Sequence, residues 1–210
     1  MLVTTAILTG CQTTASSTPY KKDPVKSIQV RTQLAGEHLR NGDLDAAKRS
    51  LDQALEYDAR DSNANMMMGI LLQQEGSPIN LEKAETYFKR AISSDADNAQ
   101  ARNNYGTYLY RLGRYDDAIE QLTIAGAALG YEQRYLALEN LGRVYLRKDD
   151  VVNAEKTFKQ ALSVNRDSTI SMLELAEIFY LREQYASATQ LYEQFVHRVG
   201  SNNQSSRALW

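Results

Sequence analysis

The sequence predicts an all-α protein built as a right-handed superhelical solenoid of tandem helix-turn-helix units. Only three prolines occur in 210 residues, while the good helix formers Ala, Leu, Glu, Gln, Arg and Lys are frequent. The chain aligns on itself with a period of about 34 residues, which is the length of one helical hairpin. Glycines recur near the middle of these periods, where the first helix of a hairpin would have to end.

The period divides the chain into five complete units and the beginning of a sixth. The complete units cover residues 28–61, 62–98, 99–132, 135–168 and 169–202, and residues 203–210 would start an incomplete sixth, so we expect the C-terminus to be truncated. The third unit shows the recurring positions most clearly: Tyr105, Gly106, Leu109, Gly113, Ala118, Leu122 and Ala125. This spacing resembles the tetratricopeptide repeat, a resemblance that implies stacked hairpins and a protein-binding role.

Each recurring position has a structural reason. The first helices are expected to end in the left-handed conformation that glycine adopts freely, at Gly42, Gly76 and Gly113. Acidic residues at the start of the second helices can cap their free backbone N–H groups: Asp43, Asp116 and Asp150. Alanines mark the points where the two helices of a unit cross closely: Ala47, Ala84, Ala118, Ala154 and Ala188.

The chain opens with an apolar run that is too short to span a bilayer and ends in Leu8-Thr9-Gly10-Cys11. This pattern is typical of a secretory signal, and it resembles the bacterial lipobox, in which the cysteine thiol receives diacylglycerol and the preceding peptide is removed. Residues 1–10 are therefore interpreted as the remnant of a lipoprotein signal, with Cys11 as the lipidated residue. No Lys or Arg precedes the run, so we expect the true start upstream.

Residues 11–27 are predicted to be a lipid-anchored flexible tether, because they are rich in Thr, Ser, Lys and Pro and lack apolar periodicity. Gln12 rather than Asp follows the cysteine, which resembles lipoproteins that Gram-negative bacteria release to the outer membrane. More than one acyl chain on Cys11 would give durable anchoring. The expected location is the periplasmic face of the cell outer membrane.

Composition and motifs argue against catalysis and against several kinds of ligand. A net charge of -2 and a pI near 5.8 offer no basic face for nucleic acid. His38 occupies a packing position and His197 lies late in the fifth unit, and neither has a partner at metal-ligand spacing. Phosphate-binding glycine loops and nucleophile motifs are absent from the sequence. The sequence therefore predicts a non-enzymatic protein with no cofactor, no metal and no small-molecule substrate.

The first helices of such a stack line its concave side through a fixed set of positions. The candidate partner-binding residues at these positions are Thr32, Leu39, Met66, Met67, Ile70, Asn103, Asn104, Thr107, Tyr110, Asn140, Arg143 and Leu146. Gln29, Leu136 and Glu139 belong to the same set. Asn104 and Asn140 occupy equivalent positions in neighbouring units, where each amide could pair with both the carbonyl and the N–H group of an extended peptide.

An apolar stretch at Met66, Met67 and Ile70 is expected to hold apolar side chains of a partner, since methionine conforms to irregular surfaces. The alternative is that residues 66–68 pack in the core, as most helical methionines do, in which case only Met68 is certain to point inward. Among the many tyrosines, Tyr110 is the one expected to serve as a platform for a ligand.

The run RTQLAGEHLRNGDLDAAK at residues 31–48 and the run NNYGTYL at residues 103–109, with the lipobox and tether, resemble the PilF/PilW-type pilotins of type IV pilus systems. This resemblance implies a lipoprotein that binds the secretin subunit and promotes its outer-membrane localisation and assembly. Members of that family have six units, whereas this chain completes five. A scaffold lipoprotein for outer-membrane barrel assembly and an adaptor of peptidoglycan hydrolases remain alternatives, because a fold does not fix its partner.

Overall fold

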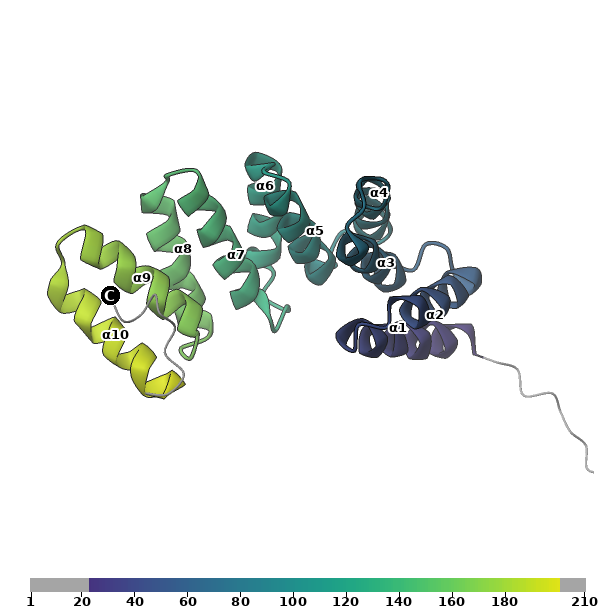
Figure 1. Ribbon diagram of the computed structural model, residues 1–210, viewed down its shortest axis with the longest axis horizontal. Coiled ribbons are helices and arrows are strands. Elements are labelled where there is room, and N and C mark those ends of the chain that lie inside the picture. Colours follow the sequence, from purple (N-terminus) through teal and green to yellow (C-terminus); the bar gives the residue numbers. More distant parts are fainter. Residues whose placement is uncertain (1–22, 201–210) are drawn as a thin grey trace, which may run out of the picture.

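The computed structural model describes residues 23–200, and every regular element within them is an α-helix. Five hairpins follow one another in an elongated array (Figure 1). The helices are α1 (Pro24–Arg40), α2 (Leu44–Tyr57), α3 (Ser62–Glu75), α4 (Pro78–Ser94), α5 (Ala99–Arg111), α6 (Tyr115–Ala127), α7 (Arg134–Arg147), α8 (Val151–Val164), α9 (Thr169–Leu181) and α10 (Tyr185–Val199). The predicted all-α solenoid is confirmed. The signal remnant, Cys11, most of the tether and the start of the sixth unit lie outside the described residues.

Helix α1 begins at Pro24, so the last residues of the predicted tether, 24–27, are helical. The Asp23 carboxylate accepts a hydrogen bond from the backbone N–H of Val25 at 3.0 Å and caps the helix. Proline is suited to the first helical position, because the N–H that it lacks would have no partner there. The cap and the proline together therefore extend the first hairpin towards the N-terminus.

The turns inside the hairpins confirm the role predicted for the glycines. Gly42, Gly76 and Gly113 have φ values of +76°, +74° and +74°, in the left-handed region. The same turn in the fourth and fifth hairpins holds Asp149 and Glu183, with φ values of +57° and +59°. Left-handed backbone is less favourable for these two residues than for glycine, so the last two hairpins carry a small local strain that the first three avoid.

Two of the three predicted helix caps are confirmed. The Asp43 carboxylate accepts a hydrogen bond from the N–H of Ala46 at 2.9 Å, and Asp150 accepts one from Asn153 at 3.1 Å. The prediction for Asp116 is wrong. The residue directly after the turn glycine of the third hairpin is Arg114, which takes the cap position without a side-chain hydrogen bond. Asp116 therefore lies in the first turn of α6, where its carboxylate pairs with Lys148.

Small residues allow the two helices of each hairpin to pack closely, as predicted. The five alanines at the helix crossings are buried, with at most 2% of their surface exposed. Opposite them, a Cβ atom on Gly69, Gly106 or Gly142 would come within 3 Å of a large side chain from the second helix, respectively Phe88, Leu122 and Phe158. These glycines therefore have no room for a side chain, which explains their place in the pattern.

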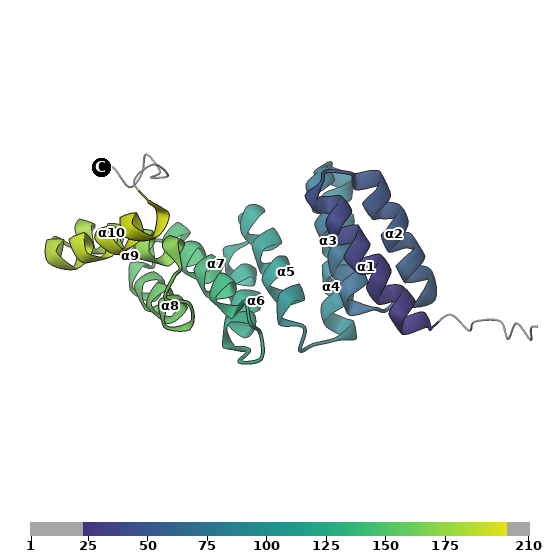
Figure 2. The same ribbon diagram turned by 90° about the horizontal axis from the view of Figure 1, so that it is seen from below.

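The first helices of consecutive hairpins lie beside one another, with α1 against α3, α3 against α5, and α5 against α7. The first and last hairpins lie at opposite ends of the array (Figure 2). One hydrophobic core runs through the first three hairpins and reaches Leu141 and Val144 in α7. No helix between residues 23 and 200 has the length and apolar character needed to cross a membrane.

Candidate protein-binding groove

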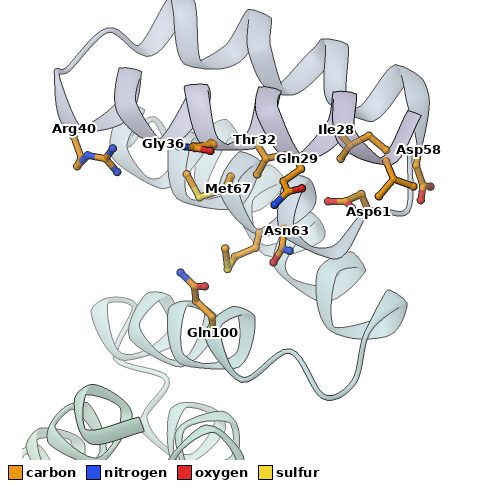
Figure 3. A pocket seen from close by; sticks show the side chains of 13 residues that line it. Ile28, Gln29, Thr32, Gly36, Arg40, Asp58, Asp61, Asn63, Met67 and Gln100 are labelled. Atoms are coloured by element: carbon orange, nitrogen blue, oxygen red, sulfur yellow. The ribbon is translucent and has the colours of Figure 1, made fainter. Parts of the chain in front are cut away.

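A cavity of about 570 Å³, here called the N-terminal pocket, opens between α1, α3 and the start of α5 (Figure 3). Met67 and Thr32 face each other across its centre, and Gly36 leaves space beside the Met67 methyl group, which would lie 3.4 Å from a Cβ atom there. Arg40 marks one end, while Asp58 and Asp61 mark the other. The pocket thus has an apolar centre and ends of opposite charge.

The floor of this pocket differs in part from the prediction. Met67 is partly buried and lines the cavity, as does Thr32. Met66 also borders the cavity but is only 3% exposed, so the expectation of a solvent-facing side chain is wrong for it. The alternative that methionines pack in the core therefore holds for Met66 and Met68, which is 2% exposed. The Thr32 hydroxyl is buried without a hydrogen-bond partner among residues 23–200.

Leu39, predicted to line the groove, is instead buried in the core of the first three hairpins. It follows Ala35 by four residues, so both side chains lie on the same face of α1. Ala35 is fully buried against the neighbouring helices, and this face cannot also be the groove. Gln29, one turn before Thr32 on the same side of the helix, is exposed and lines the pocket.

The two equivalent asparagines use their amide N–H groups inside the protein. The Asn104 amide donates to the backbone carbonyl of Gln100 at 3.0 Å and to the Met66 sulfur at 3.3 Å. The Asn140 amide donates to the side-chain Oδ1 of Asn103 at 3.0 Å and to the Thr107 hydroxyl at 3.2 Å. The prediction that each amide pairs with both peptide groups of a ligand is therefore wrong, because only the carbonyl oxygens remain.

These hydrogen bonds give the asparagines a structural role, since Asn104 joins its hairpin to Met66 of the preceding one and Asn140 joins its hairpin to Asn103 and Thr107. Asn103, also predicted as a partner-binding residue, is only 8% exposed and accepts one of them. Glu139 is a further correction, because it is 2% exposed and does not face the groove. It accepts hydrogen bonds from the hydroxyls of Ser168 and Ser171 at the start of α9. Burial raises the pKa of the Glu139 carboxyl, and these hydrogen bonds only partly offset that effect.

Two more cavities continue the concave surface. A middle pocket of about 310 Å³ lies between α3 and α5 and is lined by Ile70, Gln73, Gln74, Asn104, Thr107 and Arg111. An arginine pocket of about 540 Å³ is formed by α5, α7 and α9 and is lined by Tyr110, Arg143, Leu146, Arg147 and Glu174. The predicted residues Ile70, Asn104 and Thr107 thus share one cavity, and Tyr110, Arg143 and Leu146 share the other.

Several lining residues were missed by sequence reasoning. Arg111 and Arg147 follow Thr107 and Arg143 by four residues, so they continue the same helical stripe one turn beyond the positions considered. Helical periodicity alone could have found both. Asp58 and Asp61 lie in the connection between two hairpins, and no periodic signal marks them. Among residues 23–200 there is no cluster of three or more His, Cys, Asp or Glu side chains that could hold a metal ion.

Comparison with known proteins places these features in context. The tetratricopeptide repeat model matches residues 32–78, 80–128 and 139–203. The type IV pilus assembly protein PilF of Pseudomonas aeruginosa is 32% identical over 200 residues, which are 94% of this chain and 78% of PilF.

Two solved structures resemble the fold over most of its length. A structure of P. aeruginosa PilF has a TM-score of 0.82 and 31% identity, with 89% of this chain and 81% of that chain covered. The crystal structure of PilW, described as a widely conserved type IV pilus biogenesis factor, has a TM-score of 0.74 and 26% identity, covering 87% and 81% of the two chains.

Proposed function

This chain belongs to the tetratricopeptide-repeat family that includes the type IV pilus assembly protein PilF, and from that premise we propose that it is a pilotin. In this role it binds the secretin subunit of a type IV pilus system and promotes the localisation and assembly of that subunit at the outer membrane. The family works as a repeat scaffold in pilus biogenesis and not as an enzyme. Contacts with another protein therefore carry the function.

The N-terminal pocket is the observation that most supports this proposal. Its centre offers the thioether of Met67 and the edge of Met66, which adapt to apolar side chains of varied shape. Its rim is polar, with Gln29, Gln33 and Gln100 available to hydrogen-bond a partner. An apolar centre within a polar rim is the usual anatomy of a protein-binding site. A cavity of about 570 Å³ is large enough for one or two apolar side chains of a secretin segment.

The membrane part of the proposal rests on the sequence. Leu8-Thr9-Gly10-Cys11 resembles a lipobox, and Gln12 resembles the residue that permits release to the outer membrane. A lipid on Cys11 would hold the repeats at the periplasmic face, and acyl chains would give a bound secretin subunit the membrane affinity it lacks alone. In this proposal Cys11 supplies location and the groove supplies recognition.

Binding of the purified secretin subunit tests recognition directly. Met67→Glu places a charge at the centre of the pocket and should weaken binding by about tenfold or more, since a desolvated unpaired charge costs more than ~1.4 kcal/mol. Met67→Leu keeps an apolar side chain of similar volume and should bind nearly as well as the natural chain. Gln100→Arg, an exposed substitution on the opposite wall, should weaken binding without touching the core.

Circular dichroism and thermal melting of each variant separate loss of binding from loss of fold. Secretin binding that is unchanged in both Met67→Glu and Gln100→Arg would contradict the proposed site. Recovery of barrel-assembly proteins or peptidoglycan hydrolases from envelope extracts, with no secretin, would favour one of the alternative scaffolds.

Lipidation is tested separately in cells that express the chain with its upstream start. Fatty-acid labelling should mark the natural chain, whereas Cys11→Ser should remain unlabelled, soluble in the periplasm and folded. Secretin rings should then be scarce at the outer membrane. An unlabelled natural chain would end the lipoprotein part of the proposal and leave the groove unaffected.

A further inference from the structure

We infer that the arginine pocket and the adjoining middle pocket bind an acidic segment of the partner, while the N-terminal pocket holds an apolar segment of the same chain. This inference rests on the proposed function and deepens it, because it states what kind of sequence the partner must carry. The partner segment would combine a short apolar run with a run of aspartate or glutamate residues. Three observations support the acidic part.

The first observation is the set of arginines that line the two pockets. Arg111 lines the middle pocket, and Arg143 and Arg147 line the arginine pocket from successive turns of α7. Glu174 is the one acidic residue among the lining residues of these two pockets, and its side chain is only 6% exposed. The surface offered to a partner is therefore positively charged.

The second observation is that most guanidinium N–H groups of Arg143 and Arg147 have no hydrogen-bond partner among residues 23–200. Arg147 donates through Nε to the Tyr110 hydroxyl at 3.1 Å, and its other nitrogens bond to no residue between 23 and 200. Arg143 Nε lies 3.8 Å from a Glu174 carboxylate oxygen, which is an ion-pair distance but too long for a hydrogen bond. A guanidinium has five donors, so both arginines retain several for a ligand.

Arginines at comparable turns outside the groove behave differently. Arg114 forms ion pairs with both Glu85 and Asp117, and Arg182 pairs with Glu155. Arg111 has no ion pair with any described residue. Arg114 and Arg182 are thus paired with carboxylates, whereas Arg111 and Arg147 in the groove have no ion pair with a described residue. Tyr110 also holds the Arg147 side chain in place, which lowers the entropy that binding would cost.

The third observation is that the three pockets lie along one path. Met67 and Ile70 are on neighbouring turns of α3, and the first lines the N-terminal pocket while the second lines the middle pocket. Arg111 and Tyr110 are adjacent in α5, and they line the middle pocket and the arginine pocket. The path therefore crosses α1, α3, α5 and α7, which are neighbours in the array.

The spread of the arginines favours a chain with several carboxylates over a single phosphate group. Arg111 lines a different cavity from Arg143 and Arg147, so one small anion in either cavity could not engage all three. Successive aspartate or glutamate side chains of an extended segment could do so. Arginine is also the side chain best suited to carboxylates, because its planar fork can donate two parallel hydrogen bonds.

The test uses the purified chain with the secretin subunit and with overlapping synthetic peptides that span the secretin sequence. A second peptide set carries Asn and Gln in place of Asp and Glu. We expect the binding peptides to combine an apolar run with an acidic run, and their amide versions to bind about tenfold more weakly or worse. Binding should also weaken as salt concentration rises.

The double variant Arg143→Gln with Arg147→Gln should lose the preference for acidic peptides while melting like the natural chain. Arg49→Gln removes the same kind of charge from an exposed position on α2, outside the three pockets, and should change nothing. The inference would be overturned if the acidic and amide peptides bound equally well and the double variant bound the secretin subunit as strongly as the natural chain. The pilotin proposal would remain intact.

Absence of any secretin binding by the natural chain would instead contradict the pilotin proposal itself. Binding to phosphatidylglycerol vesicles tests whether the arginines recognise an anionic lipid surface instead. Binding to these vesicles that depends on Arg143 and Arg147, without a preference for acidic peptides, would overturn the inference in favour of an anionic lipid surface.

Discussion

The contact between the second and third hairpins is aromatic, whereas the contact between the fourth and fifth hairpins is polar. In the first, the rings of Tyr105 and Tyr108 lie 5.8 and 5.4 Å from the ring of Phe88, centre to centre. In the second, the Glu139 carboxyl accepts hydrogen bonds from two serines, and Arg143 lies beside Glu174. The two contacts differ in chemistry and in the helices that form them. The aromatic contact joins the second helix α4 to α5, whereas the polar contact joins the first helices α7 and α9.

This difference shows that packing within a hairpin and packing between hairpins are set separately. Phe88 and Phe158 fill the same space opposite Gly69 and Gly142, so the second and fourth hairpins are alike inside. Their surroundings in the next hairpin differ, because Phe88 also contacts the rings of Tyr105 and Tyr108, whereas Phe158 has no such ring contact among the described residues. The polar contact lies next to the arginine pocket, which Arg143 and Glu174 line.

Loss of an aromatic ring should have the largest effect and should distinguish the two contacts. Phe88→Ala and Phe158→Ala should each destabilise the protein by about 3–5 kcal/mol, because both rings are fully buried. Phe88→Ala should cost about 1 kcal/mol more, since only Phe88 has aromatic partners among the described residues. Urea unfolding followed by circular dichroism measures both. Equal costs would show that the ring contacts add nothing across hairpins.

A smaller loss of stability is expected when Glu85, near the aromatic contact, is substituted. Burial would raise the pKa of the Glu85 carboxyl, but hydrogen bonds from Lys89, Arg114 and Tyr105 outweigh burial and lower the pKa to about 2. The carboxylate therefore stabilises the fold above its unfolded pKa near 4.5, and this contribution is lost as the pH falls towards 2. Glu85→Gln should cost on the order of 1–3 kcal/mol at pH 7.

The melting temperature of Glu85→Gln should also fall less steeply than that of the natural chain between about pH 5 and pH 2. The exposed ion pair of Lys48 with Asp52 supplies the matched control, because Asp52→Asn should change stability by less than about 0.5 kcal/mol. Parallel pH profiles for Glu85→Gln and the natural chain would mean that the Glu85 hydrogen bonds do not stabilise the fold.

Substitution of Glu139, in the polar contact, should change stability in the opposite direction to substitution of Glu85, and by the smallest amount. Its pKa is raised by burial, against the opposing effects of Ser168 and Arg143, so the folded state binds a proton more tightly than the unfolded state. Its contribution to stability is therefore greatest at low pH and falls as the pH rises through the folded pKa. Glu139→Gln should raise the melting temperature at neutral pH by a few degrees, or about 1 kcal/mol.

Thermal melting at pH 4 and pH 8 measures this change, and the advantage of Glu139→Gln should disappear at the lower pH. A variant that is less stable than the natural chain at both pH values would show that the ionised carboxylate is required. The polar contact would then be a stabilising charge network and not a weak point of the array.

The sequence predicted packing within hairpins better than packing between hairpins. Features inside a hairpin repeat along the chain, so periodicity gave the helices, the left-handed turns at Gly42 and Gly76, and the helix crossings. Features between hairpins depend on residues that meet across about 34 positions and leave no periodic trace. The hydrogen bond from Asn140 to Asn103 and the buried carboxyl of Glu139 were missed for this reason.

The sequence predicted some residues of the candidate site correctly and others wrongly, depending on how close each residue lies to the packed face of its helix. Met67, Ile70 and Tyr110 line the cavities and are only partly buried, because they lie at the edges of the buried faces of their helices. Leu39 and Met66 lie nearer those faces and are buried. Distinguishing such residues requires the rotation of each helix against its neighbours, which depends on side-chain packing in three dimensions.

Site-specific photo-crosslinking in living cells tests most directly whether the N-terminal pocket holds the secretin. A benzophenone amino acid is placed at Met67, in the pocket, and in a second strain at Lys156, an exposed residue of helix α8. Illumination should join the chain to the secretin subunit from position 67 and not from position 156. Crosslinks to other envelope proteins from position 67, with none to secretin, would contradict the account.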